Sequence, residues 1–242
     1  MYNYIIFGLI ICLLLIFTSN YKIFNNSKRH KIIICMSYTD NISSYSKYTE
    51  YINKKYAEKH GYGFVKYNVE LNDRAQQWCK VKTINDLLQK NIDYDYIFWI
   101  DSDAFFNNFN KSLDSIIDKY TDKDIIICDD IPNSGKKNTI NTGTMFIKCS
   151  EWSKQFCNEW FNYEGEFLHT HYHEQSVLEN YINNDINDFK KHIKIYPTKT
   201  FNSDANELNE YKKTDDLIIH LMARTPEIRV YYIQKWMKDN QI

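Results

Sequence analysis

Two aspartates separated by one residue, Asp101 and Asp103, follow an apolar run at residues 97–100. The run reads IFWI and follows a polar stretch, which is typical of a central strand buried on both faces. The end of such a strand lies at the edge where open α/β sheets bind ligands. If the backbone stays extended, both carboxylates point the same way and offer oxygen ligands to Mg²⁺ or Mn²⁺. We expect a divalent ion that clamps a diphosphate, although this spacing also arises by chance in a chain with 31 acidic residues.

A second candidate site is a group of three histidines, His169, His171 and His173. In an extended segment all three would share one face, which is a hypothesis for a zinc site. Structural zinc sites usually need a fourth ligand, and catalytic ones need supporting hydrogen bonds that a sequence does not reveal. A secreted or anchored metal-dependent hydrolase that uses this cluster is the alternative function from another enzyme class.

The elements that must position these residues alternate between strand and helix. β-Branched or apolar runs bounded by polar residues predict strands, and apolar residues at helical spacing predict helices. The alternation is typical of an α/β fold with a mostly parallel central sheet flanked by helices. The expected strands cover residues 31–36, 63–67, 97–100, 125–128, 144–147, 193–196 and 217–219. The expected helices cover residues 45–60, 78–90, 113–120, 151–161, 174–183 and 227–237, and a loop covers 129–137.

A polar loop that begins with Ser37 and Tyr38 follows the first strand, where α/β folds commonly meet a nucleotide. The chain has no Gly-x-Gly-x-x-Gly segment and no phosphate-binding loop that ends in Gly-Lys-Ser or Gly-Lys-Thr. A nucleotide would therefore be held by a metal and by side chains. The formal net charge of −1 gives no long-range attraction to nucleic acid, so no nucleic-acid partner is expected.

The N-terminus differs from the rest of the 242-residue chain. Residues 4–17 are apolar and uncharged, which is shorter than the roughly 20 residues that a spanning helix needs. Flanking residues extend this run to spanning length and no clear Ala-x-Ala site follows, so we favour an uncleaved signal anchor over a cleaved signal peptide. Its orientation stays open, because the basic residues follow the run rather than precede it. We expect the anchor and its flank at residues 1–24, a linker at 25–30 and one domain at 31–242.

Several segments together resemble glycosyltransferase family 34, which includes fungal α-galactosyl- and α-mannosyltransferases and plant xyloglucan xylosyltransferases. The specificity of the resemblance lies in their order and spacing along the expected domain. The matching segments are residues 53–62 (NKKYAEKHGY), 78–80 (WCK), 99–104 (WIDSDA), 141–147 (NTGTMFI), 152–153 (WS), 174–176 (EQS) and His220.

The resemblance implies a GT-A fold, a nucleotide-sugar donor, retention of the anomeric configuration and a type II Golgi anchor. It also implies Mn²⁺ as the cofactor, with Mg²⁺ as the alternative. Asp101 and Asp103 would bind the metal and the donor, with Ser102 between them. His220 would complete the metal site, and Lys80 would contact the nucleotide.

The same resemblance assigns the sugar pocket. Asn141 and Gly143 would shape it, Gln175 would lie near the anomeric carbon, and Glu174 would orient donor hydroxyls. Since a neutral amide is a poor nucleophile, we favour attack from the same face that the leaving group departs from. One departure concerns the family's late His-Phe-x-Gly segment, which reads HLMA at residues 220–223. Arg224 follows it and would supply a phosphate-binding cation.

The leading hypothesis is a membrane-anchored retaining transferase of galactose, mannose, xylose or glucose, facing the Golgi or ER lumen. A UDP-sugar donor is favoured over a GDP-sugar, and the acceptor would be a glycan or glycoprotein. A third hypothesis is an inactive glycan-binding GT-A module, against which the intact Asp101 and Asp103 argue. A homo-oligomer remains open.

Overall fold

The structure is a computed structural model of the chain that describes residues 29–118, 120–130, 139–204 and 215–242. The chain divides into two compact units, Met1–His30 and Lys31–Ile242. The signal anchor expected at residues 1–24 lies outside the described residues. Among the helices that are described, none has both the length and the apolar character needed to cross a membrane.

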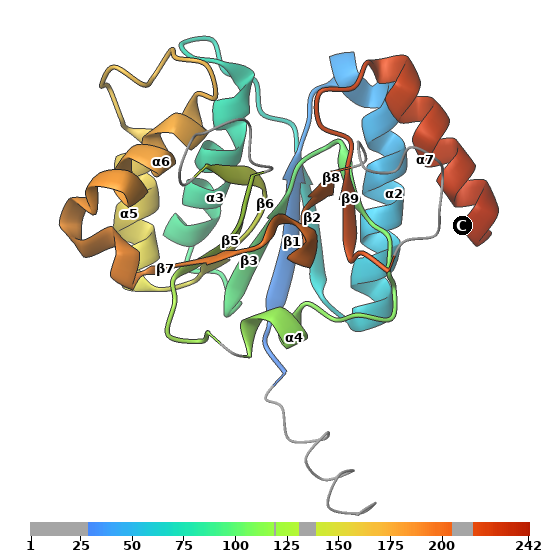
Figure 1. The fold of residues 1–242 in the computed structure, drawn as a ribbon, viewed down its shortest axis with the longest axis horizontal. Helices are drawn as coiled ribbons and strands as arrows, with labels where there is room; N and C mark the ends of the chain where they lie inside the picture. The colour runs from blue at the N-terminus through green and yellow to red at the C-terminus, as the bar shows by residue number, and fades with distance from the viewer. Residues whose placement is uncertain (1–28, 119, 131–138, 205–214) are drawn as a thin grey trace, which may run out of the picture. The chain divides into compact units, whose positions relative to one another are not determined.

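The larger unit is built on a six-stranded sheet in the order β2-β1-β3-β6-β5-β7 (Figure 1). Strand β6 runs against the other five, because it pairs antiparallel with both β3 and β5. The prediction of an α/β fold with a mostly parallel sheet is confirmed. The strands are β1 (Ile32–Ser37), β2 (Gly63–Tyr67), β3 (Tyr96–Ile100), β5 (Ile125–Asp129), β6 (Ile140–Lys148) and β7 (Ile193–Tyr196).

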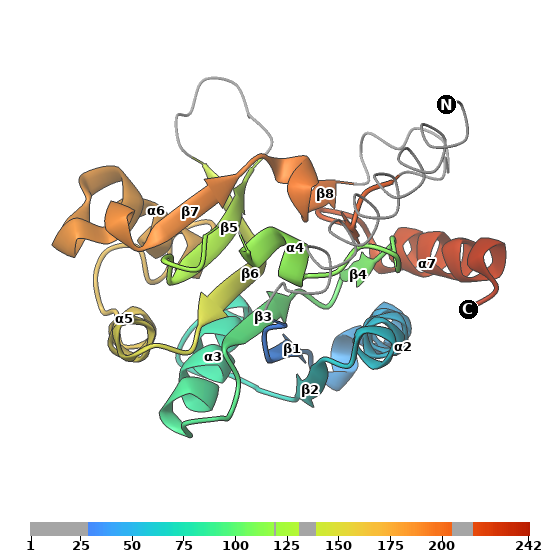
Figure 2. The same cartoon turned by 90° about the horizontal axis from the view of Figure 1, so that it is seen from below.

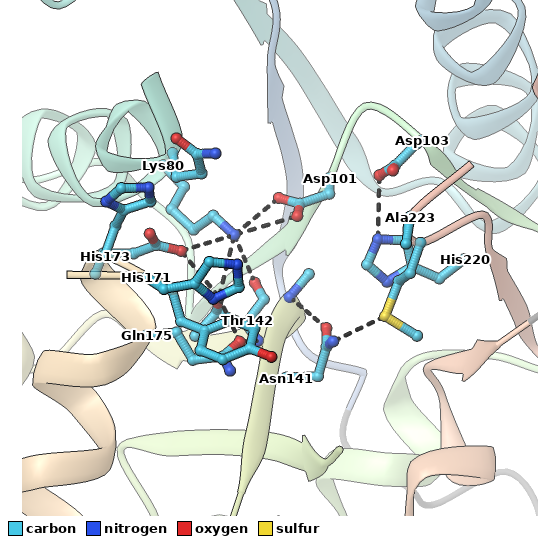
Figure 3. A pocket seen from close by; sticks show the side chains of 15 residues that line it. Lys80, Asp101, Asp103, Asn141, Thr142, His171, His173, Gln175, His220 and Ala223 are labelled. Carbon is cyan, nitrogen blue, oxygen red and sulfur yellow. Dashed lines mark hydrogen bonds and ion pairs between the residues drawn. The ribbon is translucent and has the colours of Figure 1, made fainter. Parts of the chain in front are cut away.

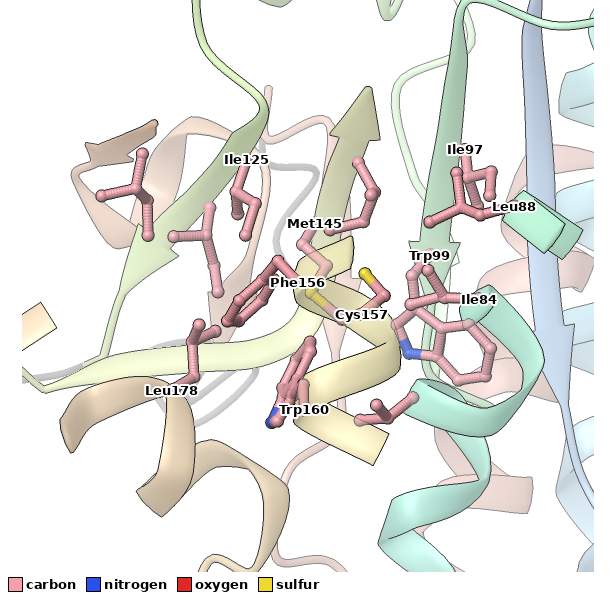
Figure 4. Close-up of a cluster of buried hydrophobic side chains, with 14 of the residues drawn as sticks. Ile84, Leu88, Ile97, Trp99, Ile125, Met145, Phe156, Cys157, Trp160 and Leu178 are labelled. Atoms are coloured by element: carbon pink, nitrogen blue, oxygen red, sulfur yellow. The ribbon is translucent and has the colours of Figure 1, made fainter. Parts of the chain in front are cut away.

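Both faces of the sheet are covered, which explains why strands β1, β3 and β5 are apolar at almost every position (Figures 1 and 2). Ile97 and Trp99 of β3 pack with residues of α3, α5 and α6 in the cluster that Figure 4 shows. Phe98 and Ile100 point to the other face and pack with residues of α2 and α4. The helices are α2 (Ser43–His60), α3 (Cys79–Gln89), α4 (Asp114–Ile117), α5 (Glu151–Phe161), α6 (Glu174–Asn184) and α7 (Pro226–Asn240).

A second, three-stranded sheet has the order β4-β9-β8. Its strands are β4 (Ala104–Phe106), β8 (Ser203–Asp204) and β9 (Ile218–His220). Strand β4 pairs antiparallel with β9 and places Ala104 opposite His220. Helix α7 packs beside α2, and Phe105 lies in an apolar cluster with residues of both helices. The pairing of β4 with β9 brings the C-terminal part of the chain close to the end of β3.

Two local expectations differ from the structure. The helix expected at residues 113–120 is the single turn α4, after which the ring of Tyr120 packs edge-to-face on Tyr196 of β7. The strand expected at 144–147 is longer, because pairing of Cys128 with Asn141 extends β6 toward its start. The expected loop at 129–137 lies mostly outside the described residues.

Candidate active site

The carboxyl end of β3 opens onto two adjoining cavities. We call the cavity of about 320 Å³ the inner cavity and the cavity of about 260 Å³ the outer cavity. They share Gln77, Lys80, Asp101 and Asp103. The inner cavity also contains Asn141, Gly143, Glu174, Gln175 and His220, and the outer contains Ser37, Tyr38 and Ser102. Of the expected site residues, Arg224 lines neither cavity.

Asp101 and Asp103 lie on a turn rather than on an extended strand, so the condition under which both carboxylates would point the same way is not met. The amide of Ala104 donates to the carbonyl of Asp101 at 3.0 Å, and β4 begins there. The amide of Asp101 donates to the carbonyl of Gly143 at 2.8 Å, which ties the turn to β6. One ligand atom each of Asp101, Asp103 and His220 nevertheless lies within 4.8 Å of the others. The turn and the β4–β9 pairing therefore bring the three side chains together.

Asp103 is held between two cationic side chains. Its Oδ1 lies 3.1 Å from Nε2 of His220, and its Oδ2 accepts from Nη2 of Arg229 at 2.5 Å (Figure 3 draws the first contact). Burial opposes ionisation of Asp103, but the charges of His220 and Arg229 outweigh it, so the pKa of this carboxyl is lowered. Burial alone would lower the pKa of His220, yet the carboxylate of Asp103 raises it overall. The surroundings of Asp103 therefore favour a carboxylate on Asp103 and an imidazolium on His220.

Asp101 belongs to a different network, centred on the buried ammonium of Lys80. The ammonium lies 3.1 Å from Asp101, 3.2 Å from Glu174 and 3.2 Å from the hydroxyl of Thr142. Burial would lower the pKa of Lys80, but the two carboxylates raise it overall. The indole of Trp99 also donates to Asp101 at 2.7 Å. The nucleotide contact expected of Lys80 stays a prediction; the described contacts make Lys80 the counter-ion that links Asp101 to Glu174.

Glu174 and Gln175 begin α6 and face the inner cavity. Burial raises the pKa of Glu174, and Lys80 opposes this effect. Its Oε1 contacts Lys80, while its buried Oε2 has no hydrogen-bond partner among the described residues. The carbonyl oxygen of the Gln175 side chain accepts from the amide of Thr142 at 3.2 Å, and its nitrogen donates to Glu179 at 3.2 Å. Gln175 is therefore fixed in place, while one oxygen of Glu174 can still accept a ligand's hydroxyl.

Gly143 leaves the space that His220 occupies. A Cβ atom at this position would lie 2.1 Å from Cε1 of His220, closer than side chains tolerate. Nδ1 of His220 lies 2.9 Å from the side-chain oxygen of Asn202. The amide nitrogen of Asn202 donates to Asn141 at 2.8 Å. The bond to Asn202 fixes the imidazole so that Nε2 faces Asp103.

The segment after β9 explains one departure from the family pattern. Ala223 stands where the family has glycine and has a φ of 52°, in the left-handed region that glycine adopts most easily. Ala223 lines the inner cavity. The backbone at this position therefore has a conformation that is less favourable for alanine than for glycine.

The alternative hypothesis, in which His169, His171 and His173 form a metal site, is not favoured. Positive φ angles of 76° at Tyr172 and 47° at His173 turn the backbone, so the alternation of an extended segment is lost. Of the residues described, the group with metal-binding geometry is Asp101, Asp103 and His220. His171 and His173 instead line the inner cavity in front of Lys80 (Figure 3).

Two contacts of this site were not expected from the sequence. Asn202 is fully buried and lies 61 positions from Asn141, and no pattern around it indicates a role. Arg229 is separated from Asp103 by 126 positions. The only feature of the sequence that pointed to this contact was a basic residue near the start of the helix expected after His220.

The group Asp101, Asp103 and His220 fits a divalent cation. Two carboxylates and one imidazole provide oxygen and nitrogen ligands within 4.8 Å of one another, a donor set that suits a first-row divalent ion such as Mn²⁺. The space left by Gly143 admits the imidazole into this group. Its position where the two cavities meet leaves room for further ligands from a substrate.

Comparison with curated proteins finds fungal sugar transferases. An alpha-1,2-galactosyltransferase of Schizosaccharomyces pombe is 26% identical over 201 residues, which cover 69% of this chain and 53% of the relative. A probable alpha-1,6-mannosyltransferase, MNN10 of Saccharomyces cerevisiae, is 25% identical over 181 residues, covering 62% of this chain and 46% of the relative. The chain therefore spans about half the length of these relatives.

Solved structures with the same fold are also glycosyltransferases. A glycosyltransferase involved in the glycosylation of the major capsid of PBCV-1 has a TM-score of 0.70 at 20% identity, covering 85% of this chain and 99% of that one. The galactosyltransferase LgtC, solved with donor and acceptor sugar analogs, has a TM-score of 0.55 at 11% identity, covering 85% and 94%. These likenesses confirm the expected GT-A fold.

The sequence profile of the galactosyl transferase GMA12/MNN10 family matches residues 27–131 and 115–228. These matches include the Asp-x-Asp turn, the start of α6 and His220. The expected resemblance is confirmed, and the chain belongs to this family, glycosyltransferase family 34.

Proposed function

We propose that this chain is a metal-dependent retaining glycosyltransferase, which moves a hexose or pentose from a nucleotide-sugar donor to a glycan or glycoprotein acceptor. The observation that carries the proposal is the group Asp101, Asp103 and His220 at the junction of the two cavities. Membership of a galactosyltransferase family supports it. Because the chain spans about half of its curated relatives, we do not transfer their donor sugar or linkage to it.

The two cavities suggest how a donor would be seated. The nucleoside would lie in the outer cavity beside Ser37 and Tyr38, and the sugar in the inner cavity, so that the diphosphate passes Asp101 and Asp103. When bound there, Mn²⁺, or Mg²⁺ in its place, would neutralise charge on the diphosphate leaving group. Lys80 would hold Asp101 in position through the ion pair between them.

The inner cavity would hold the reacting sugar. The free oxygen of Glu174 would accept a sugar hydroxyl, and Gln175 would lie beside the anomeric carbon. Gln175 is uncharged and Glu174 is paired with Lys80, so neither is an activated nucleophile. We therefore favour same-face attack: the acceptor oxygen bonds to the anomeric carbon as the bond to the diphosphate oxygen breaks. The departing phosphate would take the acceptor's proton.

The proposal is tested by measuring donor hydrolysis by the full-length protein with and without Mn²⁺. The donors would be UDP-galactose, UDP-glucose, UDP-xylose, UDP-N-acetylglucosamine and GDP-mannose, of which we favour a UDP-sugar. Turnover of one donor that requires the metal and disappears in Asp103→Ala would support the proposal and name the sugar. Folded protein that neither binds nor hydrolyses any of them would favour an inactive module.

We also propose that residues 1–24 anchor the protein in the ER or Golgi membrane with the catalytic domain in the lumen. The support is the apolar run at residues 4–17. Carbonate extraction and protease protection of the expressed full-length chain test attachment and orientation separately. Release by carbonate would contradict the anchor, and digestion of the domain in sealed vesicles would contradict the lumenal orientation. Size-exclusion chromatography with light scattering would decide the open question of a homo-oligomer.

A further inference from the structure

Arg229 connects the C-terminal helix α7 to the Asp-x-Asp turn. It lies in the first turns of α7, whose start is set by Thr225: the Thr225 hydroxyl accepts from the amide of Ile228, and Pro226 takes the first helical position. The guanidinium reaches Asp103, and both side chains are largely buried, with exposed fractions of 16% and 14%. An ion pair this deep is screened little by solvent and needs well-placed hydrogen bonds to be tolerated.

The guanidinium of Arg229 is fixed on three sides. Its Nη2 donates to Oδ2 of Asp103 at 2.5 Å, its Nη1 donates to the hydroxyl of Tyr45 at 3.0 Å, and its Nε donates to the carbonyl of Leu221 at 3.2 Å. It also lies over the ring of Tyr45, with 4.8 Å between the guanidinium carbon and the ring centroid. Tyr45 lies on α2 and Leu221 lies in the segment after β9, so the fold determines the orientation of the guanidinium.

The position of Arg229 relative to the cavities shows what it does to Asp103. Arg229 lines the outer cavity and not the inner one, whereas His220 lines the inner and not the outer. Asp103 lines both, with Oδ2 toward Arg229 and Oδ1 toward His220. Oδ2 is thus occupied by a rigid donor, and Oδ1 is directed at His220.

We propose that Arg229 is a positioning residue for the divalent-metal site, because it fixes the carboxylate of Asp103 so that Oδ1 faces the ion. The inference rests on the proposed function, which supplies the metal. Tyr45 supports Arg229 in turn through its hydroxyl and its ring. Partners that orient a metal ligand typically change metal affinity about 10- to 100-fold when they are removed.

The test measures Mn²⁺ affinity of the full-length protein without nucleotide, from the electron paramagnetic resonance signal of free Mn²⁺. We expect Arg229→Gln to weaken binding by about 10- to 100-fold and Tyr45→Phe to weaken it by a smaller factor. Lys238→Gln on the same helix is the matched control, and its Mn²⁺ affinity should stay within about twofold of wild type, because Lys238 is exposed and lines neither cavity. Thermal unfolding identifies variants that remain folded, and Tyr45→Phe decides the question if Arg229→Gln does not fold.

A double-mutant cycle separates positioning from a general loss of packing. In an Asp103→Asn background, Arg229→Gln should have little further effect on the Mn²⁺ affinity that remains. Unchanged or tighter binding by folded Arg229→Gln would overturn the inference, since tighter binding means that the guanidinium competes with the ion. Absence of Mn²⁺ binding by the wild type would instead overturn the proposed function and the inference with it.

Discussion

Asp101 and Asp103 are two positions apart in the chain, yet their carboxylates have opposite surroundings. Around Asp101, two carboxylates share the single buried ammonium of Lys80. Around Asp103, one carboxylate is shared by two cationic side chains, His220 and Arg229. We call Asp101, Lys80 and Glu174 the Asp101 flank, and Asp103, His220 and Arg229 the Asp103 flank. The first flank is short of positive charge, and the second has an excess of positive charge when His220 carries a proton.

This difference assigns different tasks to the two flanks. The Asp101 flank couples the turn to α6 through Lys80 and depends on that one ammonium for its charge balance. The Asp103 flank can accept a divalent ion only when His220 gives up its proton, because the same Nε2 faces Asp103 and would bind the metal. Folding should therefore depend most on the Lys80 ammonium of the first flank, and proton-linked metal binding on His220 of the second.

Lys80→Met should have the largest effect on stability. It leaves Asp101 and the buried Glu174 without their counter-ion, and removal of one partner from a buried ion pair costs about 3 to 5 kcal/mol. Urea denaturation gives the change in the free energy of unfolding. Lys82→Met on the same helix is the control, because its ion pair with Asp86 is partly exposed to solvent and should contribute less than about 1 kcal/mol. Equal losses in the two variants would contradict the importance of the buried network.

Gly143→Ala should damage the Asp103 flank selectively. The added methyl group would lie 2.1 Å from Cε1 of His220, so the imidazole must move, and overpacking of this kind costs about 1 to 3 kcal/mol. We expect Mn²⁺ affinity to fall together with stability. Isothermal titration with Mn²⁺ beside urea denaturation measures both quantities. Wild-type metal affinity in this variant would mean that His220 is not needed where the structure places it.

The sequence predicted the elements of this site better than its contacts. The run at residues 97–100 specified β3 because a strand covered on both faces needs apolar side chains at every position. It could not specify the turn after Ile100, which depends on the bond from Asp101 to Gly143 in another strand. The contact of Arg229 with Asp103 likewise requires the β4–β9 pairing and the docking of α7 on α2.

The histidine segment also shows that the spacing of residues does not determine the backbone conformation. Alternating histidines predict one shared face only if the backbone is extended, and the left-handed conformations of Tyr172 and His173 remove that condition. Neither residue type indicates such a conformation in a sequence. Family resemblance succeeded where spacing failed, because ordered motifs carry the tertiary arrangement that one segment does not.

Asp103→Asn and Asp101→Asn compare the two carboxylates directly in the metal-free protein. Asp103→Asn leaves His220 and Arg229 buried without their carboxylate, and we expect a loss of about 2 kcal/mol in the free energy of unfolding. Asp101→Asn should cost about 1 kcal/mol, because Lys80 keeps Glu174 as a partner. Urea denaturation at neutral pH measures the difference, and a larger loss for Asp101→Asn would mean that the Lys80–Glu174 contact does not compensate for the lost carboxylate.

The pH dependence of metal binding gives the smallest expected change and tests the Asp103 flank alone. The pKa of His220 is raised above 6.5 by Asp103, so its charge stabilises the metal-free fold fully below about pH 6.5 and loses this contribution as pH rises through the folded pKa. Metal binding has the opposite sign, because Mn²⁺ must displace the proton on His220. Its affinity should increase by at most about tenfold per pH unit, about 1.4 kcal/mol, and level off above the pKa of His220. Titrations with Mn²⁺ between about pH 6 and 8 measure this slope.

Asp103→Asn removes the charge that raises the pKa of His220, so the plateau should begin at lower pH in this variant. An affinity that is independent of pH in the wild type would mean that His220 is already neutral or does not bind the ion, and the charge asymmetry between the flanks would then have no part in metal binding.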